Sequence, residues 1–107
     1  MHNCRVDFDA LPWIGPMAGI RFKVCRQGGR QLRLVEFARG FVELDWCLRG
    51  HIGYILEGRM ELQFAGGSTL YGPGDGVFIP PGDEHKHKGI VLGDVVRVVL
   101  VEDAPPD

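Results

Sequence analysis

Two short stretches of this 107-residue chain carry the side chains best suited to metal chemistry. The first contains Asp45, Cys47 and His51, and the second contains His85 and His87. A thiolate and imidazoles are borderline-soft ligands that suit Zn, Fe, Ni or Cu, and a carboxylate widens the choice to include Mn. The stretches contain no closed motif of the paired CxxC type, so the residues alone are weak evidence for a divalent transition metal site.

The spacing of these residues predicts which of them share a face. Side chains two apart in a strand point the same way, so Asp45 is expected beside Cys47, and the two histidines of the second stretch beside each other. On the following strand His51 shares its face with Gly53. The missing side chain of Gly53 predicts empty volume where a ligand could sit.

A plainer interpretation gives these residues structural roles only. Cys47 is then a small buried hydrophobic residue, and Asp45 caps a turn. The run 84–88 is then a solvated strand edge that its lysines protect from aggregation. Both interpretations place the two stretches at strand ends or in adjoining turns.

The elements that must position these residues are all expected to be β-strands. Sixteen glycines and seven prolines separate short segments rich in Val, Ile, Leu and Phe, and no segment repeats its apolar residues at helical spacing. Met60, Leu62 and Phe64 alternate with polar residues, which predicts an inward and an outward face. One barrel is expected over about residues 19–103, after an irregular segment 1–18. Eight strands are predicted, at residues 20–26, 31–37, 41–47, 51–56, 59–65, 76–79, 85–91 and 95–101.

The last predicted strand, 95–101, is apolar on both faces except at Arg97, whereas a strand with one solvated face alternates. Something must therefore cover its outer face. Sheet packing in a homodimer is the simplest cover, and the N-terminal segment around Trp13 is the alternative. Arg97 is expected at the surface or in a salt bridge rather than at an anionic ligand.

Composition and charge exclude several classes of function. The net charge of -2 leaves no basic surplus for a phosphate backbone, so no nucleic-acid partner is expected. The chain shows no apolar run of about 18 residues and no export signal, so no membrane partner is expected and the cytoplasm is the expected location. Three cysteines are an odd number, which indicates reduced thiols rather than a disulfide framework.

The residues from 74 to 89 resemble the second sequence motif of the cupin superfamily. Gly74 is followed after five residues by Pro80, then by Gly82 and, two residues later, by His85. The motif is matched without a gap up to this histidine. Its final asparagine is replaced by Gly89.

The first cupin motif is matched in its frame but altered in its metal ligands. Asp45 and Cys47 stand where the family has two histidines, and His51 stands where the family has glutamate. Gly58 then follows at the expected distance, and the run 51–58 looks like the strand and turn of small single-domain cupins. Together the two motifs extend the resemblance over about residues 40–89.

The resemblance implies an all-β, double-stranded β-helix (jelly-roll) barrel formed by one domain, 1–107, with a divalent metal inside and frequent dimerisation. By position it implies Cys47, His51 and His85 as metal ligands, with Asp45 as a fourth ligand and His87 as an alternative. We therefore expect a standalone barrel that binds a small polar molecule beside a metal ion, either as a binding protein or as a metal-dependent enzyme acting on a small polar metabolite. The alternative is a metal-free binding or sensing module. No second acid/base pair of suitable spacing accompanies these residues, so no reaction is predicted.

Overall fold

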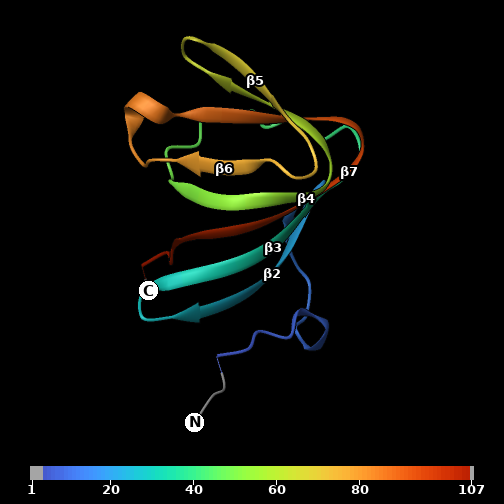
Figure 1. Ribbon diagram of the computed structural model, residues 1–107, viewed down its shortest axis with the longest axis vertical. Coiled ribbons are helices and arrows are strands. Elements are labelled where there is room, and N and C mark those ends of the chain that lie inside the picture. Colours follow the sequence, from blue (N-terminus) through green and yellow to red (C-terminus); the bar gives the residue numbers. More distant parts are fainter. Residues whose placement is uncertain (1–3, 107) are drawn as a thin grey trace.

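The computed structural model of the protein describes residues 4–106 and confirms the all-β prediction (Figure 1). Its regular elements are seven strands and two short 3-10 turns. The turns are η1 (Phe8–Ala10) and η2 (Asp83–His85). The strands are β1 (Ile14–Met17), β2 (Ile20–Gln27), β3 (Arg30–Phe37), β4 (His51–Phe64), β5 (Gly67–Tyr71), β6 (Gly76–Ile79) and β7 (His87–Asp103).

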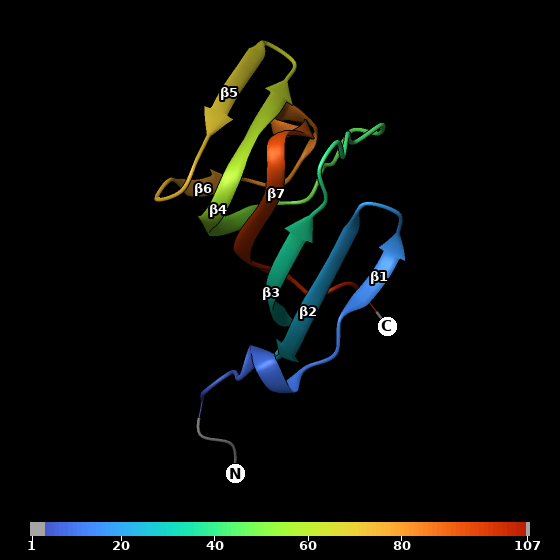
Figure 2. The ribbon, with the colours of Figure 1, turned by 90° about the vertical axis from the view of Figure 1, so that its right-hand side faces the viewer.

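All strand pairs are antiparallel, and the sheet order is β1-β2-β3-β7-β4-β5, with β6 paired to β4. The long strands β4 and β7 pair with each other along most of their length. Both strands bend midway (Figures 1 and 2). The first half of β4 pairs with β6 and its second half with β5, while the second half of β7 pairs with β3. The sheet thereby folds over itself into the jelly roll that the sequence predicted.

The bend of β4 is located at Gly58. Its φ of 81° lies in the left-handed region, and a Cβ there would collide with the backbone of Val95 on β7. The pairing of β4 with β7 shifts register on both sides of Glu57. Because pairing continues past this bend, the predicted strands 51–56 and 59–65 are one strand. For the same reason 85–91 and 95–101 fall almost entirely within β7.

The predicted strand 41–47 is wrong. This segment makes only two isolated bridges to β7, from Val42 to Ile90 and from Cys47 to His87. The prediction also missed β5 and β1, and the latter lies within the segment expected to be irregular. Residues 1–3 of that segment lie outside the described residues. β5 carries the polar sequence GSTLY, which gives little apolar signal for a strand.

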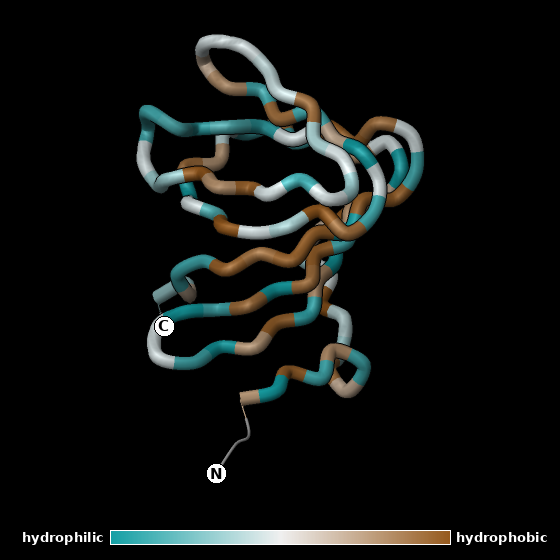
Figure 3. Tube along the Cα trace, in the orientation of Figure 1, coloured by the Kyte–Doolittle hydropathy of each residue, from teal (hydrophilic) through white to brown (hydrophobic). Residues whose placement is uncertain are grey.

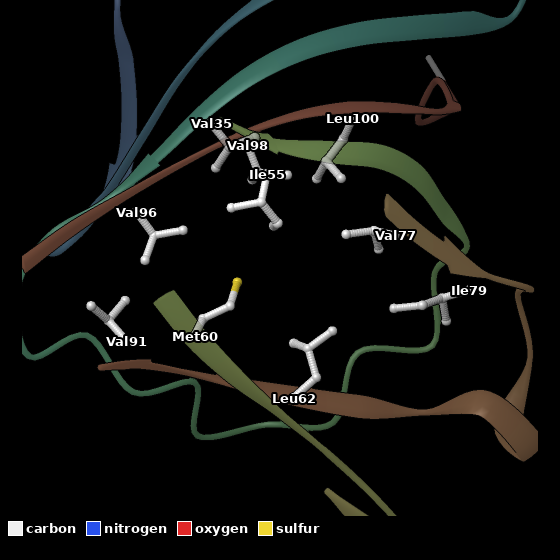
Figure 4. Packing of buried hydrophobic residues seen from close by; sticks show 10 residues of the cluster. All are labelled: Val35, Ile55, Met60, Leu62, Val77, Ile79, Val91, Val96, Val98 and Leu100. Carbon is white, nitrogen blue, oxygen red and sulfur yellow. The ribbon is translucent and has the colours of Figure 1, made fainter. Parts of the chain in front are cut away.

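The hydrophobic core lies between the two halves of the folded sheet. Met60 and Leu62 are buried and Phe64 is partly buried, which confirms the inward face predicted for this stretch. Burial of each aliphatic side chain of this size contributes about 1.5–3 kcal/mol. Apolar residues run along the strands that bound this space (Figure 3). The ten core side chains point towards one another from both halves (Figure 4): Val35, Ile55, Met60, Leu62, Val77, Ile79, Val91, Val96, Val98 and Leu100.

None of the helical turns in the described part of the chain has the length and hydrophobicity that crossing a membrane requires.

Candidate metal centre

Three side chains with metal-binding atoms meet at one end of the barrel. Cys47, His51 and His87 offer one sulfur and two ring nitrogens, and these atoms all lie within 4.8 Å of one another. His51 begins β4 and pairs with Ile79, whereas His87 begins β7 and pairs with Phe64 at the far end of β4. The folding of the bent sheet over itself brings the two rings together. His87 is buried, and the other two residues are partly buried.

Backbone hydrogen bonds hold Cys47 opposite His87 although no regular strand forms there. The Cys47 N–H donates to the His87 carbonyl at 2.8 Å, and the His87 N–H donates to the Cys47 carbonyl at 3.0 Å. This reciprocal pair is the hydrogen-bonded register of an antiparallel ladder. The thiol therefore has a defined position beside the ring, even though the surrounding segment is irregular.

Glu102 fixes the orientation of the His51 ring through a hydrogen bond to Nδ1. Its side chain is only 1% exposed, and its Oε2 lies 2.6 Å from His51 Nδ1. The other oxygen, Oε1, accepts hydrogen bonds from Arg33 Nε and, at 2.8 Å, from Gln31 Nε2. The carboxylate can only accept, so His51 donates through Nδ1 and presents Nε2 to Cys47 Sγ, 3.6 Å away.

A second acceptor orients His87 in the same way. The His87 Nδ1 lies 3.1 Å from the His85 carbonyl oxygen, and since a carbonyl only accepts, Nδ1 carries the proton. Nε2 of His87 is then left free for Cys47 or for an ion. The two imidazole rings lie edge to face, with their centroids 5.1 Å apart. Both histidines thus present the same ring nitrogen to the thiol.

The charges of the group are strongly coupled. Burial opposes ionisation of the Cys47 thiol, but its contacts with His51 and His87 outweigh burial and lower its pKa to about 6. Burial likewise disfavours the charged form of His51, but Cys47 and Glu102 raise its pKa to about 9. At neutral pH the lowered pKa of Cys47 and the raised pKa of His51 favour a thiolate beside an imidazolium.

The pKa of Glu102 is lowered, although burial alone would raise it. Burial raises the pKa of this carboxyl, whereas hydrogen bonds from His51 and Arg33 lower it to about 2. The pKa of His87 is raised, because its contacts with Cys47 and the His85 backbone outweigh its burial. Glu102 therefore stays ionised at neutral pH and keeps its acceptor role towards His51.

The structure does not bring Asp45 or His85 into this group. Both are exposed. His85 ends the turn η2, so the two-residue alternation that would have set it beside His87 does not apply there. Asp45 lies at a bend of the irregular segment. Glu43 turns to the barrel instead, and its Oε1 accepts a hydrogen bond from the Gly89 N–H at 2.8 Å.

The empty volume predicted at Gly53 is not there. A Cβ at this position would collide with the Val99 carbonyl oxygen and with a methyl group of Leu100. The missing side chain allows β4 and β7 to approach closely, so its place is taken by the neighbouring strand. Gly53 does not line the cavity inside the barrel that could hold a ligand.

Glu102 was not among the site residues predicted from the sequence. A signal for it exists, because Glu102 follows Val96, Val98 and Leu100 at two-residue spacing and so continues the inward face of β7. A carboxylate on an otherwise apolar buried face requires a partner. The three donors come from Gln31, Arg33 and His51, which are far from Glu102 in the sequence.

One sulfur and two ring nitrogens are ligands that zinc and related ions accept, and one of their separations can be compared with that of a tetrahedral ion. With Zn–S near 2.3 Å and Zn–N near 2.1 Å, a tetrahedral angle separates sulfur from nitrogen by about 3.6 Å. The distance between Cys47 Sγ and His51 Nε2 has this value. Both histidines also have the hydrogen-bonded second nitrogen that metal-bound imidazoles usually show. The donor set therefore suits the ion that the fold implies.

A cavity of about 180 Å³ adjoins the group inside the barrel. Its wall includes Cys47, His51 and His87, together with most of the apolar core side chains. Arg33, Arg49 and Glu43 are its other charged lining residues. A ligand in the cavity would thus lie next to the thiol and the two imidazoles.

Comparisons with known proteins agree with this architecture. A model of the cupin domain matches residues 49–101. The structure of KdgF from Halomonas sp. is 25% identical with a TM-score of 0.72, covering 91% of this chain and 92% of that chain. An RmlC-like cupin from Shewanella frigidimarina is 14% identical with a TM-score of 0.77, covering 99% and 95%. The polyketide cyclase RemF from Streptomyces resistomycificus is 23% identical with a TM-score of 0.76, covering 95% and 81%.

No curated protein matches the sequence significantly. The domain match, the likeness to solved cupins and the jelly-roll topology nevertheless agree on one assignment. The chain belongs to the cupin superfamily.

Proposed function

We propose that this cupin binds a small molecule in its barrel beside a divalent transition metal held by Cys47, His51 and His87. The observation that carries the proposal is the convergence of one sulfur and two nitrogens within 4.8 Å at the cavity wall. Sulfur and imidazole ligands favour Zn, Fe, Ni or Cu. Neither Asp45 nor His85 is needed for this ligand set.

The roles of the surrounding residues follow from their contacts. A divalent ion held by Cys47, His51 and His87 would supply Lewis acidity towards an oxygen of a bound molecule. Glu102 keeps His51 in the tautomer that presents Nε2, and the His85 carbonyl does the same for His87. The apolar wall of the cavity excludes water from the far side of the ligand. This arrangement supports binding, and we assign no reaction to it.

The test is the metal content per chain, measured by mass spectrometry on untagged protein purified without chelators. We expect near one equivalent in the wild type and a loss of most of it in Cys47→Ser, His51→Ala and His87→Ala. His85→Ala is the matched control, because His85 is exposed and lies two residues from His87, and it should keep the ion. Unchanged stoichiometry in the first three variants would remove the proposed ligands.

One observation favours the metal-free alternative, a non-enzymatic binding or sensing module. His51 links Cys47 to Glu102 through both ring nitrogens, so the buried charges compensate one another without an ion. Under this alternative the wild type contains no metal even after reconstitution under reducing conditions. It would then still bind its ligand.

We further propose a homodimer that packs through the outer face of the sheet. Phe78, Tyr54 and Ile52 are 75%, 51% and 45% exposed, and Ile52 pairs with both Phe78 and Val101. Among its described residues, the N-terminal segment lies over β2, where Trp13 stacks against two basic side chains, and over a hollow that Cys4 and Val6 share with Leu32 and Val101. A continuous apolar surface therefore remains over β6 and β4, and a second copy is its simplest cover.

The cytoplasm is the location that suits this site. Cys47 must be a reduced thiolate to bind an ion, and the cysteines of the described residues are free.

A further inference from the structure

We propose that the cavity takes a small carboxylate with a short apolar body, and that Arg33 and Arg49 hold the carboxylate group. This inference rests on the proposed function, because it names the class of molecule that the same pocket binds. Three features carry it. They are the size of the cavity, the division of its wall into apolar and cationic parts, and the unused donors of the two arginines.

The size of the cavity limits the ligand to a few carbon atoms. Its volume is about 180 Å³, which corresponds to roughly six water molecules at ~30 Å³ each. Sites for drug-sized ligands measure about 300–1,000 Å³. A sugar chain or a nucleotide is therefore too large to enter entirely, whereas a molecule the size of butyrate fits.

Most of the wall is apolar. Nine of the fifteen residues that line the cavity are aliphatic or aromatic, Ile55, Met60 and Phe37 among them. Strand register places the polar groups towards one end, because His51 begins β4 while Ile55 lies two inward positions further along the strand. A ligand with one polar and one apolar end matches this division.

Arg33 and Arg49, the cationic residues of the wall, each have N–H groups that donate no hydrogen bond within the described chain. Arg33 faces inward from β3, its guanidinium lies 4.9 Å over the Phe22 ring, and its Nε donates to Glu102. Arg49 donates from Nη2 to the Asp103 carbonyl at 3.0 Å. Within the described residues neither guanidinium makes another hydrogen bond. The remaining N–H groups form the planar donor pattern that matches a carboxylate.

The charge balance of the pocket also calls for one anion. Arg33 and Arg49 are balanced in number by Glu102 and Glu43. A divalent ion bound by a single thiolate leaves one positive charge. A monocarboxylate neutralises it, whereas a neutral molecule of the same shape leaves that charge and the arginine donors without a partner.

The experiment is a calorimetric titration of the metal-loaded protein with sodium butyrate and, separately, with butyramide, which has nearly the same shape but no charge. We expect saturable binding of butyrate and at least about tenfold weaker binding of butyramide. Arg33→Gln and Arg49→Gln should each raise the butyrate Kd about tenfold or more. Arg59→Gln is the control, because Arg59 does not line the cavity, and it should leave the Kd unchanged.

Arg49→Gln keeps the proposal testable if Arg33→Gln fails to fold, because Arg49 is exposed and does not contact Glu102. Equal affinity for butyrate and butyramide overturns the inference, as does an unchanged Kd in Arg49→Gln. Metal content is measured on the same samples. Bound metal without butyrate binding refutes the carboxylate and leaves the metal proposal intact, whereas arginine-dependent binding without metal supports the carboxylate and refutes the metal.

Discussion

His51 holds the central position in the site because both of its ring nitrogens have charged neighbours. Nδ1 faces the buried Glu102 and Nε2 faces the Cys47 thiol. The same geometry serves a metal-binding imidazole with a carboxylate behind it and a metal-free thiolate–imidazolium pair. Glu102 is common to both states. Its removal is therefore the most informative single change at the residue scale.

We predict that Glu102→Gln destabilises the metal-free protein by about 3 kcal/mol at pH 7, because Arg33 and the charged His51 lose a buried partner. The folded-state pKa of Glu102 is lowered from 4.5 to about 2. A lowered pKa stabilises the fold above pH 4.5, and that contribution is lost as the pH falls towards 2. The difference between wild type and variant should shrink over this range.

Urea unfolding of both proteins between pH 2 and pH 7 measures this difference. Glu84→Gln is the matched control, because Glu84 is exposed, and it should follow the wild type throughout. A difference that stays constant down to pH 2 would show that Glu102 acts through packing rather than through its charge.

At the scale of the elements, the paired strands β4 and β7 carry most of the site and the core. His51 and His87 begin these strands, and Glu102 lies near the end of β7. Close pairing of the two strands brings Glu102 within reach of His51. Gly53 permits that approach, because any larger residue would meet the backbone of Val99.

We predict that Gly53→Ala lowers the free energy of unfolding by about 2 kcal/mol or more, since its methyl group must push β4 away from β7. Chemical denaturation followed by circular dichroism measures the loss. Gly66→Ala is the control, because a Cβ there meets nothing within 4 Å and its φ is not positive. It should stay within about 0.5 kcal/mol of the wild type. Equal stability of the two variants would contradict the close approach.

At the scale of the whole molecule, the outer face of the sheet carries the side chains on which the proposed homodimer depends. Arg97 breaks the apolar surface on β7 and forms ion pairs with Glu36 and Glu57, which agrees with the surface position expected for it. The side chains of Arg97 and Glu57 are 45% and 56% exposed, so their ion pair adds little to stability. The exposed apolar side chains on β4 and β6 have no such partners within the described chain.

We predict that the wild type is a dimer and that Phe78→Glu converts it to a monomer, because a charge in an apolar interface remains unpaired. Light scattering coupled to size-exclusion chromatography gives the mass directly. Leu70→Glu is the control, since Leu70 is also largely exposed but lies on β5. It should remain dimeric. A monomeric wild type at high concentration would refute the interface.

Most of the strands, the cupin fold and the choice of Cys47 and His51 as candidate ligands were predictable from the sequence alone. These features depend on local signals, namely two-residue alternation, turn residues and motif spacing. The merging of strands at Gly58 was not predictable, because continued pairing across a bend depends on β7, a distant segment.

Only the tertiary structure decided which histidine and which carboxylate join Cys47 and His51. The turn η2 carries His85 outward and lets β7 begin with His87 facing in. Glu102 contacts His51, which is 51 residues away in the sequence. At Gly53 the strands β4 and β7 approach each other closely, so no empty volume remains there. The physical reason is that hydrogen bonds between strands and steric contacts across the barrel form between residues whose separation in sequence carries no periodic signal.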